Sequence, residues 1–441
     1  MKIRKAILIL MVILMCFSPI FATGAQERED EEAKTTISWM GGSWLFDPSA
    51  STSTGVDGIA THGGRIPYMA YLFEQENPNI DVLTINQVWE GYESTLKTRI
   101  TAKDLPELTN VHLRWMYDVA SDGGLADVTG FLNEIGMELF SPGALEGTKV
   151  NGKYYGIPYR SSGMAFYWDK NIFKEAGLDP EVPPKTWDEV LQFSKIIKEK
   201  TGKPGFALDS KTIDGMFNNI ITLIDSYGGQ VIDKEKMICT LDSPAGIKAA
   251  QFIYELNKSG ANIAGAVGLS NDDARQMFVQ GQVAMNYEGP WAVENLRQVG
   301  KEYGVDYGVT FMPSGSANEI GYSPLIGWAI TYPSWLSPEK VEIVQNFIKF
   351  VLEPERMEWF MADWGTPYLP ALETPTYAKV EREIFNEQLK YTLSPNLGVP
   401  HDAEIREILA EAHQNLTLLK ATPEEAFGKA TKDINALLQV K

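Results

Sequence analysis

The sequence predicts an α/β protein with two lobes, each built on a mixed or mostly parallel sheet with helices on its faces. Its 441 residues exceed the length of one ordinary domain, and a hydrophobic content of 44% is ample for two cores. Strand-like and helix-like patterns alternate from residue 35 onward. This alternation is the order that parallel strands with crossover helices require.

The first elements follow the order strand, helix, strand, helix. A β-prone run at 35–40 is followed by a loop rich in Ser, Thr and Gly at 49–64. The apolar spacing then predicts a helix at 65–76, a strand at 80–88 and a second helix at 92–102. These elements predict the parallel part of the first sheet.

Residues 150–200 contain the clearest local signals. Asn151-Gly152 predicts a two-residue hairpin turn, because both residues tolerate the positive φ that such a turn requires. A strand is expected at 164–168. Thr186 and Glu189 then form the pattern of a capping box, in which each side chain binds an unpaired backbone N–H at the start of a helix. The helix that follows is therefore expected to begin at residue 187.

The order of motifs in this region resembles the bacterial extracellular solute-binding proteins of ABC importers, specifically the sugar-binding group that includes the maltodextrin-binding proteins. The matching segments are GKYYGIP at 152–158, FYWDKNIFKEAG at 166–177 and PKTWDE at 184–189. Trp168 stands where this family often has Asn. The resemblance implies a periplasmic-binding-protein fold of the type II kind, in which a hinge joins two mixed α/β lobes and a ligand cleft lies between them.

The same resemblance suggests how the chain is divided between the lobes. We expect residues 35–158 and 308–360 to form lobe 1, and residues 159–307 and 361–441 to form lobe 2. Residues 26–34 are acidic and are interpreted as a spacer before the fold.

Residues 1–25 are interpreted as a cleaved signal peptide. Three basic residues precede an apolar run at 6–17, and small residues follow at 22–25. The run is shorter than the roughly 20 residues that a membrane-spanning helix needs. The protein is therefore expected to be exported to the periplasm or the cell exterior. Lipid anchoring through Cys16 is not favoured, because Met15 precedes it where a small residue is expected.

The resemblance implies a binding protein that captures a sugar or oligosaccharide by hinge closure and delivers it to an ABC permease, as a monomer, without catalysis and without a cofactor. A polyol phosphate or a peptide as the ligand, and a chemoreceptor-coupled sensor on the same fold, remain open. The formal charge of −19 argues against a nucleic-acid partner. A glycoside hydrolase is not favoured, since the sequence contains none of the common catalytic motifs, and its four His residues are scattered.

The candidate ligand contacts lie at predicted strand ends or in Gly- and Pro-rich breaks, because ligands of open α/β sheets bind beyond the carboxyl ends of strands. A pyranose has an apolar face and a rim of hydroxyl groups, so it needs an aromatic plate and polar partners. Trp291 is the strongest candidate, since the aromatic residue of this family's Gly-Pro-Trp turn commonly stacks on a sugar. The other candidates are Trp44, Trp89, Trp115, Trp328, Trp364, Glu288, Glu90, Arg114, Arg160 and Asn219. No catalytic or metal-binding residue is predicted.

Overall fold

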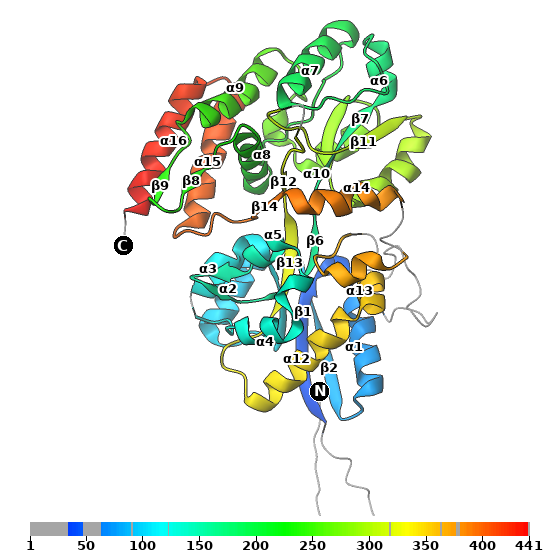
Figure 1. The fold of residues 1–441 in the computed structure, drawn as a ribbon, viewed down its shortest axis with the longest axis vertical. Helices are drawn as coiled ribbons and strands as arrows, with labels where there is room; N and C mark the ends of the chain where they lie inside the picture. Colours follow the sequence, from blue (N-terminus) through cyan, green and yellow to red (C-terminus); the bar gives the residue numbers. More distant parts are fainter. Residues whose placement is uncertain are drawn as a thin grey trace, which may run out of the picture.

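The protein has two lobes, stacked along its long axis and joined near the middle by β6 and β13 (Figure 1). The computed structural model describes residues 34–46, 63–89, 91–121, 123–316, 319–361, 364–375 and 380–439. The predicted signal peptide and most of the acidic spacer lie outside these residues. The expected architecture of two α/β lobes is confirmed.

The first lobe is built on a five-stranded sheet with the order β2-β1-β3-β13-β6. Strands β1 (Thr35–Gly42), β2 (Ile80–Gln87) and β3 (Leu108–His112) pair in parallel. Strands β13 (Ile326–Thr331) and β6 (Ile157–Ser162) add the antiparallel part. The three parallel strands end at one edge of the sheet, which faces the second lobe.

Helices cover both faces of this sheet. Helices α1 (Arg65–Glu76) and α2 (Tyr92–Ala102) have the bounds that the apolar spacing predicted. The buried ring of Trp39 packs edge-on against Phe347, with 5.2 Å between centroids, and this contact joins the sheet to α12. The remaining helices of this lobe are α3 (Met116–Ser121), α4 (Thr129–Ile135), α5 (Pro142–Glu146), α12 (Pro338–Leu352) and α13 (Pro354–Phe360).

The second lobe contains a smaller sheet with the order β10-β7-β11. Strand β7 (Ala165–Asp169) pairs antiparallel with β10 (Met285–Glu288) and with β11 (Tyr307–Thr310). Phe206 adds an isolated parallel bridge to Met285.

Two segments differ from the expected division of the chain. The return to lobe 1 was expected at residue 308, whereas β11 extends the sheet of the second lobe by pairing with β7. The next residue in the first core is Leu325. Residues 361–441 were expected in the second lobe, and the part from Leu397 to Ile434 does pack in its core. Met361 and Ala371 pack in the first core instead, and the segment that follows them contacts both lobes. Leu389 packs in the first core, whereas Phe385 packs against the second sheet.

The helices of the second lobe surround its sheet, and α14 lies at the boundary with the first lobe (Figure 1). Trp187 is buried among them and packs edge-on against Phe252, with 5.4 Å between centroids. The helices are α6 (Lys170–Glu175), α7 (Trp187–Thr201), α8 (Ile213–Ser226), α9 (Pro244–Lys258), α10 (Asn271–Val279), α11 (Trp291–Asn295), α14 (Val380–Gln388), α15 (Asp402–Thr417) and α16 (Pro423–Leu438).

Three short strand pairs complete the fold. They are β4 (Lys149–Val150) with β5 (Lys153–Tyr154), β8 (Ile232–Asp233) with β9 (Ile238–Cys239), and β12 (Ser323–Pro324) with β14 (Thr392–Leu393). The first pair confirms the predicted hairpin, since Asn151 and Gly152 have φ angles of 49° and 82°.

The capping box is also confirmed. Thr186 Oγ1 accepts a hydrogen bond from the Glu189 backbone N–H, and Glu189 Oε2 accepts one from the Thr186 N–H. Helix α7 therefore begins at Trp187, where the sequence placed it.

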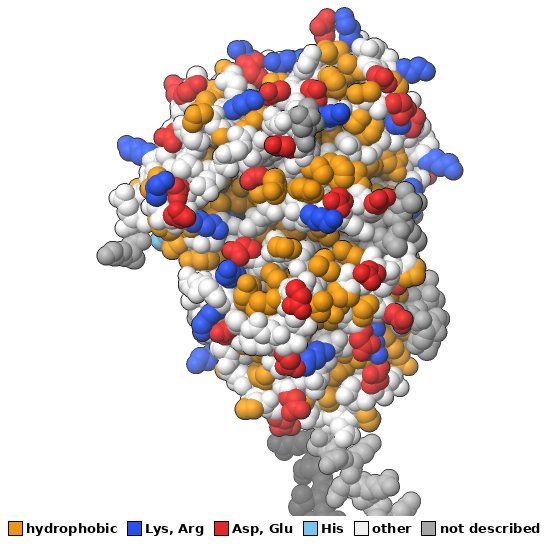
Figure 2. Space-filling view, viewed as in Figure 1, with side chains coloured by type: hydrophobic (Ala, Val, Ile, Leu, Met, Phe, Trp, Pro, Cys, Tyr) orange, Lys and Arg blue, Asp and Glu red, His pale blue; other side chains and the backbone are white. Residues whose placement is uncertain are grey.

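Lys and Arg side chains are interspersed with Asp and Glu side chains over both lobes on the face that Figure 2 shows, and hydrophobic side chains gather near its middle. Within the described part of the chain, no helix has both the length and the apolar character needed to cross a membrane.

Candidate functional site

A cavity of about 620 Å³ lies between the lobes. Its volume falls in the range of roughly 300–1,000 Å³ that is typical of small-molecule sites. The first lobe and the hinge contribute Trp44, Trp89, His112, Arg114, Arg160, Ile326, Trp328 and Trp364 to the lining, and the second lobe contributes Met164, Asp209, Thr212, Asp214, Gly215, Asn218, Ser270, Asn271, Asp272, Arg275, Tyr287 and Trp291. We call this cavity the cleft.

The first lobe supplies an aromatic wall of three tryptophans. Trp44 follows β1, Trp89 follows β2, and Trp328 lies within β13. The Trp328 ring centroid lies 4.9 Å from that of Trp44 and 5.9 Å from that of Trp89. Trp115 packs behind this wall, 5.1 Å from Trp89, and is almost fully buried. Because strands β1 to β3 end at the same edge, these residues meet although they are distant in sequence.

Trp291 faces this wall from the second lobe. It begins α11, and its indole Nε1 donates a hydrogen bond of 2.8 Å to Glu288 Oε2. Its ring is tilted by 31° from that of Trp364, with 4.4 Å between centroids. A side chain at Gly289 would place Cβ 2.1 Å from the Trp291 ring, so the turn requires glycine there. The Gly-Pro-Trp turn thus holds the indole in a defined position at the cleft.

Arg160 lies at the centre of the hinge side of the cleft. It is buried on β6, and its guanidinium carbon lies 3.1 Å from the centroid of the Trp364 ring and 5.3 Å from that of Trp44. A guanidinium group over an indole is held by cation–π attraction. Arg160 therefore links an aromatic residue of the first lobe to one near the hinge.

Arg114 forms a direct bridge between the lobes. It follows β3 in the first lobe, and its Nη1 lies 2.5 Å from Asp214 Oδ2 at the start of α8 in the second lobe. Its Nη2 also donates a hydrogen bond of 3.1 Å to Asn218 Oδ1 on the same helix. The Arg114 side chain is only 3% exposed, so this contact closes one side of the cleft.

Positive charges on both sides surround Asp214. Arg406, whose Nε lies 2.9 Å from Asp402, approaches Asp214 Oδ1 to 3.5 Å. Burial raises the pKa of Asp214, but the positive charges of Arg114 and Arg406 outweigh this effect. The pKa of Asp214 therefore lies below its usual value. Burial, and then the charge of Arg114, hold the pKa of His112 well below 6.5, so its imidazole is neutral at pH 7.

Acidic groups line the second-lobe wall. Arg275 Nη2 lies 2.6 Å from Asp272 Oδ1, and its Nη1 lies 3.6 Å from Glu288 Oε2. Burial raises the pKa of Glu288 to about 7, although Arg275 acts in the opposite direction. Burial likewise raises the pKa of Asp209 to about 7. Asp209, Asp214 and Asp272 of this wall therefore offer carboxyl groups to a ligand, and Glu288 lies behind them.

Asn219 supports the wall from behind. Its Nδ2 donates a hydrogen bond of 3.0 Å to the backbone oxygen of Asp209, and its Oδ1 accepts one from the Tyr287 hydroxyl. His413 Nε2 lies 3.4 Å from the same amide nitrogen. Asn219 therefore positions two residues of the lining.

The cleft brings together most of the candidate ligand contacts. Those in its lining are Trp44, Trp89, Trp291, Trp328, Trp364, Arg114 and Arg160. Trp115, Glu288 and Asn219 lie behind the lining, and Glu90 lies outside the described residues. The polar residues of the second-lobe wall were not predicted, although N-caps at Thr212 and Ser270 mark the starts of two helices that carry them.

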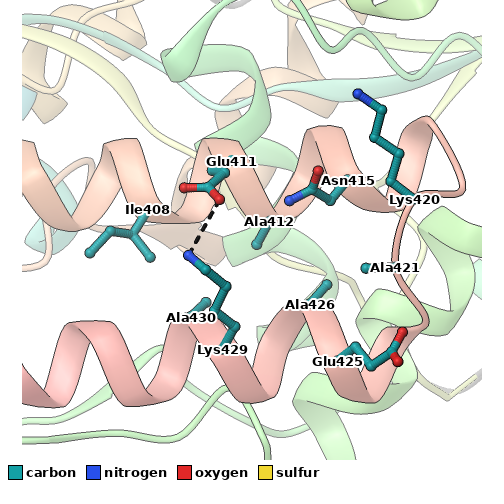
Figure 3. A pocket seen from close by; sticks show the side chains of 10 residues that line it. All are labelled: Ile408, Glu411, Ala412, Asn415, Lys420, Ala421, Glu425, Ala426, Lys429 and Ala430. Atoms are coloured by element: carbon teal, nitrogen blue, oxygen red, sulfur yellow. Dashed lines mark hydrogen bonds and ion pairs between the residues drawn. The ribbon is translucent and has the colours of Figure 1, made fainter.

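A smaller hollow of about 360 Å³ lies between α15 and α16 (Figure 3). Alanine and charged side chains line it, and the ion pair of Lys429 with Glu411, at 3.3 Å, spans it. It contains no aromatic side chain. We therefore assign the candidate site to the cleft. Among the described residues, no group of three or more His, Cys, Asp or Glu is placed to hold a metal ion.

Three known proteins illustrate the similarity. A binding protein of Brucella abortus (strain 2308) is 25% identical over 380 residues, which cover 83% of this chain and 88% of the relative. The sn-glycerol-3-phosphate-binding periplasmic protein UgpB of Escherichia coli (strain K12) is 25% identical over 416 residues, which cover 86% and 90%. The structure of the cyclic alpha-maltosyl-1,6-maltose binding protein from Arthrobacter globiformis matches with a TM-score of 0.77 at 20% identity, over 92% of this chain and 100% of that chain.

The family model of the bacterial extracellular solute-binding proteins matches residues 60–358. This match includes β2 and β13, which position Trp89 and Trp328, and the turn that carries Trp291, whereas Trp44 lies before it. The chain belongs to this family, and it is a solute-binding protein of an ABC transporter.

Proposed function

We propose that the cleft binds an uncharged sugar or oligosaccharide, and that the exported protein, as a monomer, delivers it to an ABC permease. The observation that carries the proposal is the pairing of two different walls. Three tryptophans of the first lobe face carboxylate, amide and hydroxyl groups of the second lobe. A pyranose presents one apolar face and a rim of hydroxyl groups, which match these two surfaces.

The charges of the cleft favour a neutral ligand over a phosphate ester. Arg114 is paired with Asp214, Arg275 is paired with Asp272, and Arg160 lies over the ring of Trp364. A phosphate needs cations that are available for its oxygens, and it would also meet the carboxylate of Asp209. The similarity to UgpB nevertheless makes a polyol phosphate the alternative that the experiment must include.

Closure of the lobes follows from a ligand that contacts both walls. Such a ligand favours the closed form by the difference between its affinities for the closed and the open forms. Arg114 already reaches the second lobe, so the bridge and the ligand act in the same direction. We infer that the protein closes about its hinge when it binds its solute and does not convert the solute chemically.

The test is calorimetric titration of the mature protein with glucose, maltose and maltotriose, and in parallel with sn-glycerol 3-phosphate and a dipeptide. A ligand at about 100 times its Kd should add roughly 2.7 kcal/mol to the free energy of unfolding, which also raises Tm. Binding of a saccharide without formation of a product supports the proposal. Binding of only the phosphate or the peptide would overturn the ligand class.

Trp291→Ala should weaken saccharide binding with little change in Tm. Trp335→Ala is the matched control, because Trp335 is half-buried in the first lobe and does not line the cleft. Equal loss of affinity in both variants would show that Trp291 has no specific contact with the ligand.

A further inference from the structure

Asp209 is an unusual member of the cleft lining. Its side chain is almost fully buried at 3% exposure, and its Oδ2 has no hydrogen-bond partner among the residues that the structure describes. The two other aspartates of the described lining are paired with arginines, namely Asp214 with Arg114 and Asp272 with Arg275. Asp209 is therefore the aspartate of this lining that no arginine pairs with, and one of its carboxyl oxygens lacks a hydrogen-bond donor.

Hydrogen bonds of the neighbouring residues fix the backbone that carries this carboxylate. Asn262 Oδ1 accepts a hydrogen bond of 2.9 Å from the Leu208 N–H, and its Nδ2 donates one of 3.1 Å to the Leu208 oxygen. On the other side, the Ser210 and Thr417 hydroxyl oxygens lie 3.1 Å apart. Asn219 donates to the Asp209 backbone oxygen, so contacts from Asn262, Thr417 and Asn219 hold this segment.

Helix α8 leaves space for the same carboxylate. A Cβ at Gly215, in the first turn of α8, would lie 2.1 Å from Asp209 Oδ2. The carboxylate oxygen thus occupies the place that any other residue at position 215 would fill. Gly215 and Asp209 both line the cleft, so the carboxyl group belongs to the wall that meets a ligand, with Oδ2 buried beneath Gly215.

We infer that Asp209 selects an uncharged, hydroxyl-bearing ligand over its phosphorylated counterpart. The inference rests on the proposed function of the cleft. A buried carboxylate oxygen without a partner is unfavourable, and a ligand hydroxyl group that donates to it removes this penalty. A phosphate group offers only acceptor oxygens and a like charge, and in a buried site the repulsion between the two anions is strong.

The test compares Asp209→Asn with Asp225→Asn. Asp225 lies at the far end of α8, is half-buried and does not line the cleft, so its variant removes one acidic charge from the same lobe. Affinities for glucose, maltose and maltotriose are measured by calorimetry, and glucose 6-phosphate and sn-glycerol 3-phosphate serve as charged probes. Circular dichroism and Tm show that each variant is folded.

Asp209→Asn should weaken binding of the tightest saccharide by roughly 10- to 100-fold, the usual effect of losing a charge-assisted hydrogen bond. The ratio of saccharide affinity to phosphate-ester affinity should fall by about tenfold or more. Asp225→Asn should leave both values unchanged. An unchanged affinity ratio in folded Asp209→Asn would overturn the inference and leave the sugar-binding function intact.

A second variant keeps the inference testable if Asp209→Asn does not fold. Asp209→Glu retains the negative charge but moves the oxygens toward Gly215. It should lose saccharide affinity while it still rejects both phosphate esters, and acceptance of a phosphate ester by this variant would overturn the inference. If the wild-type protein binds a phosphate ester and no saccharide, the proposed function and this inference fail together.

Discussion

The bridge between Arg114 and Asp214 predicts that one amide substitution will shift the equilibrium between open and closed lobes. Asp214 Oδ2 lies 2.5 Å from Arg114 in the other lobe, and Oδ1 lies 3.5 Å from Arg406. The Arg114 side chain is only 3% exposed, so Asp214→Asn leaves this buried cation without a full negative partner, whereas Arg406 keeps its ion pair with Asp402. Breaking a buried pair on one side costs about 3–5 kcal/mol.

The loss should lie near the lower end of that range, because the Asp214 side chain is 33% exposed and water can replace part of its contribution. About 3 kcal/mol corresponds to a change of roughly 100-fold in an equilibrium constant. Since the Arg114 contact joins the lobes, much of this change should appear as a lower population of the closed form. Apparent ligand affinity should fall in proportion to that population.

A double-mutant cycle with Asp214→Asn and Arg114→Met measures the coupling between the two residues. Calorimetry gives the affinity of each variant, and small-angle X-ray scattering gives the radius of gyration without ligand. The exposed pair Lys34 with Asp81, at 3.1 Å, provides the control, because surface pairs contribute about 0–1 kcal/mol. If Asp214→Asn keeps both the affinity and the radius of gyration of the wild type, the bridge does not govern closure.

Three further predictions concern the cleft walls. Trp89→Ala should reduce saccharide affinity by about tenfold or more with little change in Tm, because Trp89 is 47% exposed in the aromatic wall; titration measures the affinity and a thermal melt measures Tm. Gly215→Ala should also reduce affinity, since the new Cβ would displace the Asp209 carboxylate, whereas far-ultraviolet circular dichroism should remain unchanged. Burial raises the pKa values of Asp209 and Glu288 to about 7, so the folded protein binds these protons more tightly than the unfolded chain. The contribution of Asp209 to the free energy of unfolding should therefore decline as the pH rises from about 4 to 7, whereas the buried His112 and His413, whose pKa values are lowered, act in the opposite direction. The difference in free energy of unfolding between the wild type and Asp209→Asn should fall over this range, and a difference that rises with pH would contradict the assignment.

Short-range patterns in the sequence were sufficient to predict the local structure. The capping box of Thr186, the hairpin at Asn151-Gly152 and the bounds of α1 and α2 were predicted correctly. Each depends on residues within a few positions of one another, through a cap, a turn conformation or the period of a helix. The positions of the tryptophans after predicted strands also predicted that they lie near the cleft, because parallel strands end at one edge of a sheet.

The tertiary structure alone decided which side chains face the cleft. Asn219 and Glu288 lie behind the lining, whereas Asp209 and Asp214, which no motif marked, lie within it. Arg114 meets Asn218 across 104 positions of the chain, and this contact exists only because the two lobes pack together. Strand β11 joins the second sheet because its edge pairs with β7. The sequence by itself determines the elements and the aromatic character of the site, but the packing of the lobes determines its charge, its bridge and its polar wall, since those depend on distances between residues far apart in the chain.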